Sequence, residues 1–168
     1  MSDIESLKND LVIASRILAN EEICDAFGHI SVRHPVDPDR FLLARAVAPE
    51  LVTSDDIIEF NLDGSAVCDD RKPFLERFIH GTLMAARPDV QSVVHSHSRG
   101  VIPFGITDTP IRPLLHSCGV LGHDVPVWDA GDVFGDTNLL ISSNDMGADF
   151  AARLGNGRAA LMRGHGST

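Results

Sequence analysis

Two closely spaced histidines are the residues of this chain best suited to chemistry. His95 and His97 are separated by one serine, within a valine-rich stretch that predicts a core strand over 91–97. Side chains alternate along a strand, so both imidazoles project from one face, with their Cα atoms about 6.6 Å apart. Both rings can therefore reach one divalent ion. A third histidine from a distant strand would complete a facial three-nitrogen site with positions open for substrate, which is the layout of a catalytic metal.

A glycine-flanked histidine and a helical acid extend this pattern. His165 lies in the segment Arg163-Gly-His-Gly166, after a predicted strand over 159–162, and Glu76 lies in a predicted helix over 73–87. Alone, Gly-His-Gly marks a turn, Glu76 fits a solvated helix face, and two histidines on a half-exposed strand serve many roles. The order of acid, paired histidines and late histidine is what predicts a metal centre.

Composition excludes several classes of function. The chain has 168 residues, of which 43% are hydrophobic and 23% charged, as in an ordinary globular protein of one domain. Its formal net charge of −10 argues against nucleic acid or an anionic membrane as the partner. The three cysteines contain no C-x-x-C pair, and the N-terminus lacks a signal-peptide pattern. These features predict a cytoplasmic protein.

Hydrophobic periodicity predicts interleaved helices and strands. Helical spacing covers the first twenty residues, 73–87 and 145–154, and a capped short helix is expected at 53–56. Strands are expected at 28–34, 41–44, 58–62, 91–97, 125–128 and 159–162, with a loop over 105–113. The helix over 73–87 should bury Leu75, Phe78, Ile79, Leu83 and Ala86. This order predicts a single layered α/β domain.

Four motifs in this order resemble the class II aldolase/adducin superfamily. They are Gly28-His-Ile-Ser31, Glu76-x-x-x-His80, Ala86-Arg-Pro-Asp-Val90 followed by Val93-Val-His-Ser-His97, and Arg163-Gly-His-Gly166. The resemblance implies a three-layer α/β/α fold around a largely antiparallel sheet. It also implies one divalent metal ion per subunit, Zn²⁺ or Mn²⁺ before others, held by His95, His97 and His165, with Glu76 as acid/base. A homotetramer with sites at subunit interfaces is expected.

Departures from the sugar-phosphate aldolases of this family bear on the substrate. Those aldolases carry a Thr/Ser-Gly loop and a Ser-Ser pair that hold phosphate, where this chain has Leu43-Ala-Arg-Ala46 and Phe74-Leu75. Bulky apolar side chains cannot cradle phosphate as hydroxyls and glycine amides do. Arg45 can instead grip a carboxylate bidentately, and His29 offers a further donor.

The substrate contacts have alternative interpretations. The resemblance adds Ser31 and Arg163 to the substrate contacts. Arg45 fits equally a surface ion pair with Glu50 or Asp56, and His29 fits a hydrogen-bonded loop histidine. His80 is interpreted as a packed helix histidine, with orientation of Glu76 as the alternative.

The segments Ala48-Pro-Glu-Leu-Val-Thr53, Asp55-Asp-Ile57 and Lys72 to Gly81 are similar to the family's branch of hydroxypyridine dicarboxylate and dihydroxyphthalate decarboxylases. The resemblance implies a metal-dependent lyase that decarboxylates a hydroxylated aromatic or ring-cleavage-product carboxylate through a metal-stabilised enolate. An aldolase or epimerase acting on a sugar-like substrate is the first alternative, because aldol cleavage uses the same scaffold. A non-catalytic adducin-like scaffold is the second. Residues 1–168 are expected to form one such domain without the C-terminal strand and helices of relatives.

Overall fold

The centre of the computed structural model, which describes residues 3–168, is a four-stranded antiparallel sheet with the strand order β3-β2-β1-β4. Its strands are β1 (His29–Arg33), β2 (Arg40–Ala44), β3 (Ile57–Asn61) and β4 (Ser92–His95). All four were predicted. The register pairs Ser31 with Leu43 and His29 with His95, so a histidine of β1 lies directly beside the last residue of β4.

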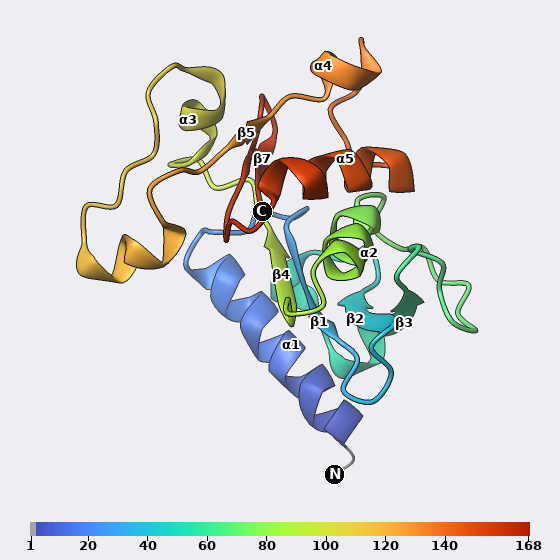
Figure 1. Cartoon of the computed structure of the whole chain (residues 1–168). Coiled ribbons are helices and arrows are strands. Elements are labelled where there is room, and N and C mark those ends of the chain that lie inside the picture. The colour runs from blue at the N-terminus through green and yellow to red at the C-terminus, as the bar shows by residue number, and fades with distance from the viewer. Residues whose placement is uncertain (1–2) are drawn as a thin grey trace.

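Helices cover both faces of this sheet (Figure 1). Helix α1 (Asp3–Asn20) lies on one face, and α2 (Arg77–Ala86) packs with α5 (Asn144–Leu154) on the other. Alternate residues of β2 supply the two cores: Leu42 and Ala44 pack toward α1, whereas Phe41 and Leu43 pack toward α2 and α5. The sheet is buried on both faces, which explains the continuous apolar run of β2. The predicted three-layer α/β/α fold is confirmed.

A second, three-stranded sheet stands at the end of the first. It contains β5 (Val127–Trp128), β6 (Leu161–Met162) and β7 (Gly166–Ser167), with β5 and β6 parallel and β6 and β7 antiparallel. Ser96 and Ser167 exchange two backbone hydrogen bonds of 3.0 and 2.9 Å, which join the two sheets. A side chain at Gly166 would clash with the carbonyl oxygen of Ser96, so this close approach requires glycine.

The remaining elements are short. They are η1 (Pro49–Leu51), η2 (Ser54–Asp56), α3 (Ile102–Ile106), η3 (His116–Leu121) and α4 (Gly131–Phe134). The predicted cap at 53–56 is confirmed, because Thr53 and Asp56 form a capping box. The first two residues of the predicted N-terminal helix lie outside the described residues. Within residues 3–168, no helix has both the length and the apolar character needed to cross a membrane.

Two predicted boundaries were wrong at the places where the chain approaches the histidines. Helix α2 begins at Arg77 rather than at residue 73, because Pro73 forms a bridge with Arg45 and Glu76 is the N-cap. Leu75 therefore lies before the helix and is exposed, and Ala86, at the other end of α2, is exposed as well rather than buried. Strand β4 ends at His95, two residues before the predicted end, so His97 lies beyond the strand.

Candidate metal centre

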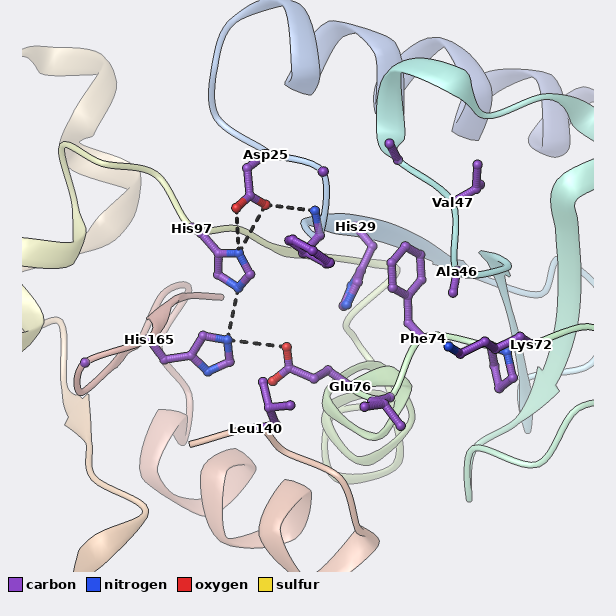
Figure 2. Close-up of a pocket in the computed structure, with 16 residues that line it drawn as sticks. Asp25, His29, Ala46, Val47, Lys72, Phe74, Glu76, His97, Leu140 and His165 are labelled. Carbon is purple, nitrogen blue, oxygen red and sulfur yellow. Dashed lines mark hydrogen bonds and ion pairs between the residues drawn. The ribbon is translucent and has the colours of Figure 1, made fainter. Parts of the chain in front are cut away.

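Four side chains from three segments converge where the two sheets meet. Glu76 is the N-cap of α2, His95 ends β4, His97 follows it, and His165 lies in the turn between β6 and β7. One ligand atom from each residue lies within 4.8 Å of the other three. Figure 2 shows Glu76, His97 and His165 pointing toward one another from different parts of the chain.

The spacing of these atoms matches the edges of a metal coordination shell. The Nε2 atom of His97 lies 3.0 Å from the Nε2 atoms of both His95 and His165. The Oε2 atom of Glu76 lies 3.4 and 3.3 Å from the same atoms of His95 and His165. Metal–nitrogen bonds of about 2.0–2.1 Å, at angles between octahedral and tetrahedral, place ligand atoms roughly 2.9–3.4 Å apart.

The outer nitrogens of two of these rings fix their tautomers. His97 Nδ1 donates to both carboxylate oxygens of Asp25 at 3.1 Å, and His165 Nδ1 donates to the carbonyl oxygen of Leu139 at 2.9 Å. Because both partners can only accept, the protons stay on Nδ1 and the two Nε2 atoms carry lone pairs. Two lone pairs 3.0 Å apart, next to a carboxylate, cannot hydrogen-bond to each other. A divalent cation between them fits this donor set.

The charges of the cluster agree with a cation site. Burial alone would raise the pKa of Glu76, but hydrogen bonds and charge from His165 and His95, when these rings carry a proton on Nε2, hold that pKa well below its ordinary value, so the carboxylate is ionised. Burial lowers the pKa of His95 and keeps this ring neutral, as a metal ligand must be. Glu76 Oε1 accepts a hydrogen bond from the backbone N–H of Ile141 at 3.1 Å, which fixes the other oxygen toward the histidines.

A cavity of about 800 Å³ opens from this cluster. Glu76, His97 and His165 line one side of it, and His29 lies beside them. Most of the remaining wall is apolar and consists of Ala26, Phe27, Ala46, Val47, Ala48, Pro73, Phe74, Leu75, Leu140 and Gly164. The charged groups outside the cluster are Asp25 and Lys72. A mostly apolar pocket with a few converging polar groups is typical of a small-molecule site.

The predicted substrate contacts lie in different places. His29 lines the cavity, with its ring against Phe74 at 4.4 Å between centroids. Ser31 is fully buried behind His29. Arg45 pairs with Asp56 at 2.7 Å, as its alternative interpretation has it, and Arg163 pairs with Asp129 at 2.8 Å. Neither arginine is among the residues lining this cavity.

Three residues near the site were not predicted from sequence. Asp25 holds His97, Lys72 lines the cavity, and the Oγ1 atom of Thr168 lies 3.3 Å from His95 Nδ1. Asp25 and Lys72 lie inside or beside the motifs quoted above, but only the fold brings them to the cluster. His80 is packed, as predicted, and it bonds to His29 and Ser31 rather than to Glu76.

Comparisons with known proteins identify the family. Residues 9–168 match the model of the class II aldolase and adducin N-terminal domain. The chain is 37% identical to decarboxylase tropJ of Talaromyces stipitatus, over 90% of the chain and 62% of that protein. It is 27% identical to the 3,4-dihydroxyphthalate decarboxylase of Arthrobacter keyseri, over 94% of the chain and 66% of that protein. The chain thus spans somewhat less than two thirds of the length of these relatives.

Solved structures agree with this assignment. The L-fuculose 1-phosphate aldolase of Glaciozyma antarctica superposes with a TM-score of 0.74 at 26% identity, over 99% of the chain and 66% of that structure. An aldolase II superfamily protein of Pseudomonas syringae, at 22% identity, covers the same shares with a TM-score of 0.80 and so shows the same fold. The chain therefore belongs to the class II aldolase/adducin family.

Proposed function

We propose that this chain is a divalent-metal-dependent carbon–carbon lyase that decarboxylates a hydroxylated aromatic or ring-cleavage-product carboxylate. The observation that carries the proposal is the cluster of Glu76 and three histidines at one side of a largely apolar cavity. The relatives named decarboxylase, at 37% and 27% identity, support the same reaction.

In this reaction the histidines would bind the metal, and Glu76 would transfer the proton. A divalent ion held by His95, His97 and His165 would supply a Lewis acid for an oxygen of the substrate. Glu76 is ionised at rest, so its Oε2 atom first takes the proton of the substrate hydroxyl. Glu76 then delivers this proton to the ring carbon that bears the carboxylate, which converts the phenolate into a ketone. When the bond to the carboxylate breaks and CO₂ leaves, its electron pair passes through the ring to the ketone oxygen and restores the phenolate.

The cavity wall favours an aromatic carboxylate over a sugar phosphate. Phe74 and Leu75 line the cavity directly before Glu76, and neither has a hydroxyl that could hold phosphate. Lys72 supplies a positive charge on the same wall, and its side chain makes no hydrogen bond or ion pair with the described residues. An apolar cavity with the ammonium group of Lys72 on its wall, apart from the cluster of Glu76 and the histidines, suits a planar aromatic acid.

An aldehyde-lyase or epimerase acting on a sugar-like substrate is the second candidate. The similarity to L-fuculose 1-phosphate aldolase, at 26% identity, favours it. A non-catalytic scaffold has less support, because the three candidate ligands and the acid Glu76 are all present and converge.

Separate measurement of the two products tests the proposal. Protein loaded with Zn²⁺ or Mn²⁺ is incubated with 3,4-dihydroxyphthalate, with simple ortho-hydroxybenzoates and with L-fuculose 1-phosphate, and both CO₂ and aldehyde are followed. We expect CO₂ from an aromatic acid, and its loss in chelated protein and in Glu76→Gln. Aldehyde from the sugar phosphate without CO₂ from any acid would refute the decarboxylase assignment and support the aldolase.

A further inference from the structure

A buried chain of three side chains runs behind the cavity wall and is not part of the metal cluster. Ser31 Oγ lies 2.6 Å from His80 Nδ1, and His80 Nε2 lies 2.7 Å from His29 Nδ1. Ser31 and His80 are completely buried and His29 is 4% exposed. These are short contacts between groups that water does not reach, so the position of each proton is fixed by its partners.

The direction of this chain follows from the hydroxyl of Ser31. The hydroxyl always carries one hydrogen, and within residues 3–168 its only hydrogen-bond partner is His80. A buried hydroxyl hydrogen without an acceptor costs about 1–3 kcal/mol. Ser31 therefore donates to His80 Nδ1, and this nitrogen carries a lone pair.

The proton positions on His80 and His29 follow from this hydrogen bond in the same way. The lone pair on Nδ1 leaves the His80 ring neutral, and burial, which lowers the pKa of His80 to about 3, agrees with this. A neutral ring with a lone pair on Nδ1 has its proton on Nε2, and His80 donates this proton to His29 Nδ1. His29 then carries its own proton on Nε2.

The Nε2 atom of His29 is open to the cavity. It has no hydrogen-bond partner in the described part of the chain, yet no fully buried side-chain nitrogen or oxygen there is unpartnered. The atom must therefore be accessible, and His29 lines the cavity.

From these contacts we propose that Ser31 and His80 are positioning residues, which fix His29 as a neutral hydrogen-bond donor that grips the substrate carboxylate through Nε2–H. In this arrangement His29 cannot act as a base, because its cavity-facing nitrogen is already protonated. It also cannot give that proton away, because resupply through the chain would leave an alkoxide on Ser31. Proton transfer is left to Glu76. The role toward a carboxylate rests on the proposed decarboxylase function, whereas the position of the protons does not.

Nitrogen-15 spectra of the histidine rings in Zn²⁺-loaded protein test the proton positions without any substrate. Long-range correlations separate a protonated ring nitrogen from one with a lone pair, and the loss of signals in His29→Gln assigns those of His29. We expect the proton of His29 on Nε2. A proton on Nδ1 and a lone pair on Nε2 would overturn the proposal, whatever reaction the protein catalyses.

A matched pair of variants tests the consequence for substrate binding. His80→Gln keeps an N–H group that can donate to His29 Nδ1, whereas the similarly long His80→Met has no hydrogen to donate, so the proton of His29 is no longer held on Nε2. A donor to a charged carboxylate is worth about 1.5–3 kcal/mol, or about 10- to 100-fold in affinity. We expect His80→Met to raise KM by up to this factor, with a smaller change in kcat, because the carboxylate loses its charge as CO₂ forms. His80→Gln should stay close to the wild type. Equal KM values for two folded variants would contradict the proposal.

Discussion

The carboxylate of Asp25 lies 3.1 Å, through both of its oxygens, from Nδ1 of His97. The same carboxylate accepts the backbone N–H groups of Phe27 and Gly28 at 2.9 and 3.0 Å. These contacts tie the loop before β1 to a candidate metal ligand. They also lower the pKa of Asp25, against burial, so it is a charged acceptor that keeps the His97 proton away from the metal side.

Asp25→Asn should weaken metal binding by about 10- to 100-fold, as substitutions of groups behind a metal ligand do. An asparagine oxygen can still accept from the backbone N–H groups, but its NH₂ group opposes the proton on His97 Nδ1. Titration of chelated protein with Zn²⁺ gives the affinity directly. Asp108→Asn, at an exposed acid, is the matched control and should bind as the wild type. Equal affinities for the two variants would show that Asp25 does not support the ligand.

Lys72→Met and Arg45→Met distinguish two candidate anion contacts. Lys72 lines the cavity, whereas Arg45 pairs with Asp56 and does not. We expect Lys72→Met to raise KM for an aromatic carboxylate by about 10-fold, the loss of one charged hydrogen bond, at unchanged metal content. Arg45→Met should reduce stability by about 1 kcal/mol, the upper end of the range for exposed ion pairs, because Asp56 is buried but keeps its hydrogen bonds from Thr53. It should leave KM nearly unchanged. The reverse pattern in steady-state kinetics would restore the sequence-based prediction for Arg45.

The stability of the metal-free protein should fall at acid pH partly because of His80. The folded state holds its pKa at about 3, whereas a histidine in an unfolded chain titrates near 6.5. Between these values the unfolded chain binds one more proton, so the free energy of unfolding decreases by about 1.4 kcal/mol for each pH unit lost. Urea unfolding of chelated wild type and His80→Gln between pH 7 and pH 4 measures this difference. Parallel curves for the two proteins would mean that His80 is protonated in the folded state.

Gly81→Ala tests the contact of α2 with the end of β3. An added Cβ would clash with the carbonyl of Leu62 and lie 3.3 Å from the ring of Phe41. In an open helix the same change would stabilise by up to about 1 kcal/mol, so the sign is informative. We expect a loss of about 1–3 kcal/mol in the free energy of unfolding. Gly119→Ala, where nothing lies within 4 Å of the added atom, should change it by less than about 0.5 kcal/mol.

The sequence pattern correctly predicted those helices and strands that are determined by residues close together in the sequence. Strand β2 is continuous and apolar because it is buried on both faces, and the cap at Thr53 uses residues three apart. The start of α2 was missed because a bridge between Arg45 and Pro73, distant in sequence, keeps the chain extended before Glu76.

The residues of the candidate site were predicted because their motifs resemble those of the class II aldolase/adducin family. The side chains that surround the site were not predicted. The three ligand candidates and the acid/base candidate Glu76 lie in the quoted motifs, and the structure brings them together. The partners of Asp25, Arg45 and Ser31 depend on which way each side chain faces in the folded sheet. Composition and periodicity carry no information on this point.

The pairing of Ser96 with Ser167 has a consequence for how the protein acquires its ion. These two residues are 71 positions apart, and each adjoins candidate ligands: His95 and His97 on one side, and the turn with His165 on the other. The complete set of nitrogens therefore exists only after residues 165–168 have docked on the edge of the first sheet. In refolding experiments, we expect metal uptake to follow formation of the antiparallel sheet. Metal binding would then measure when residues 165–168 dock on that sheet, which we expect to be the last long-range contact to form.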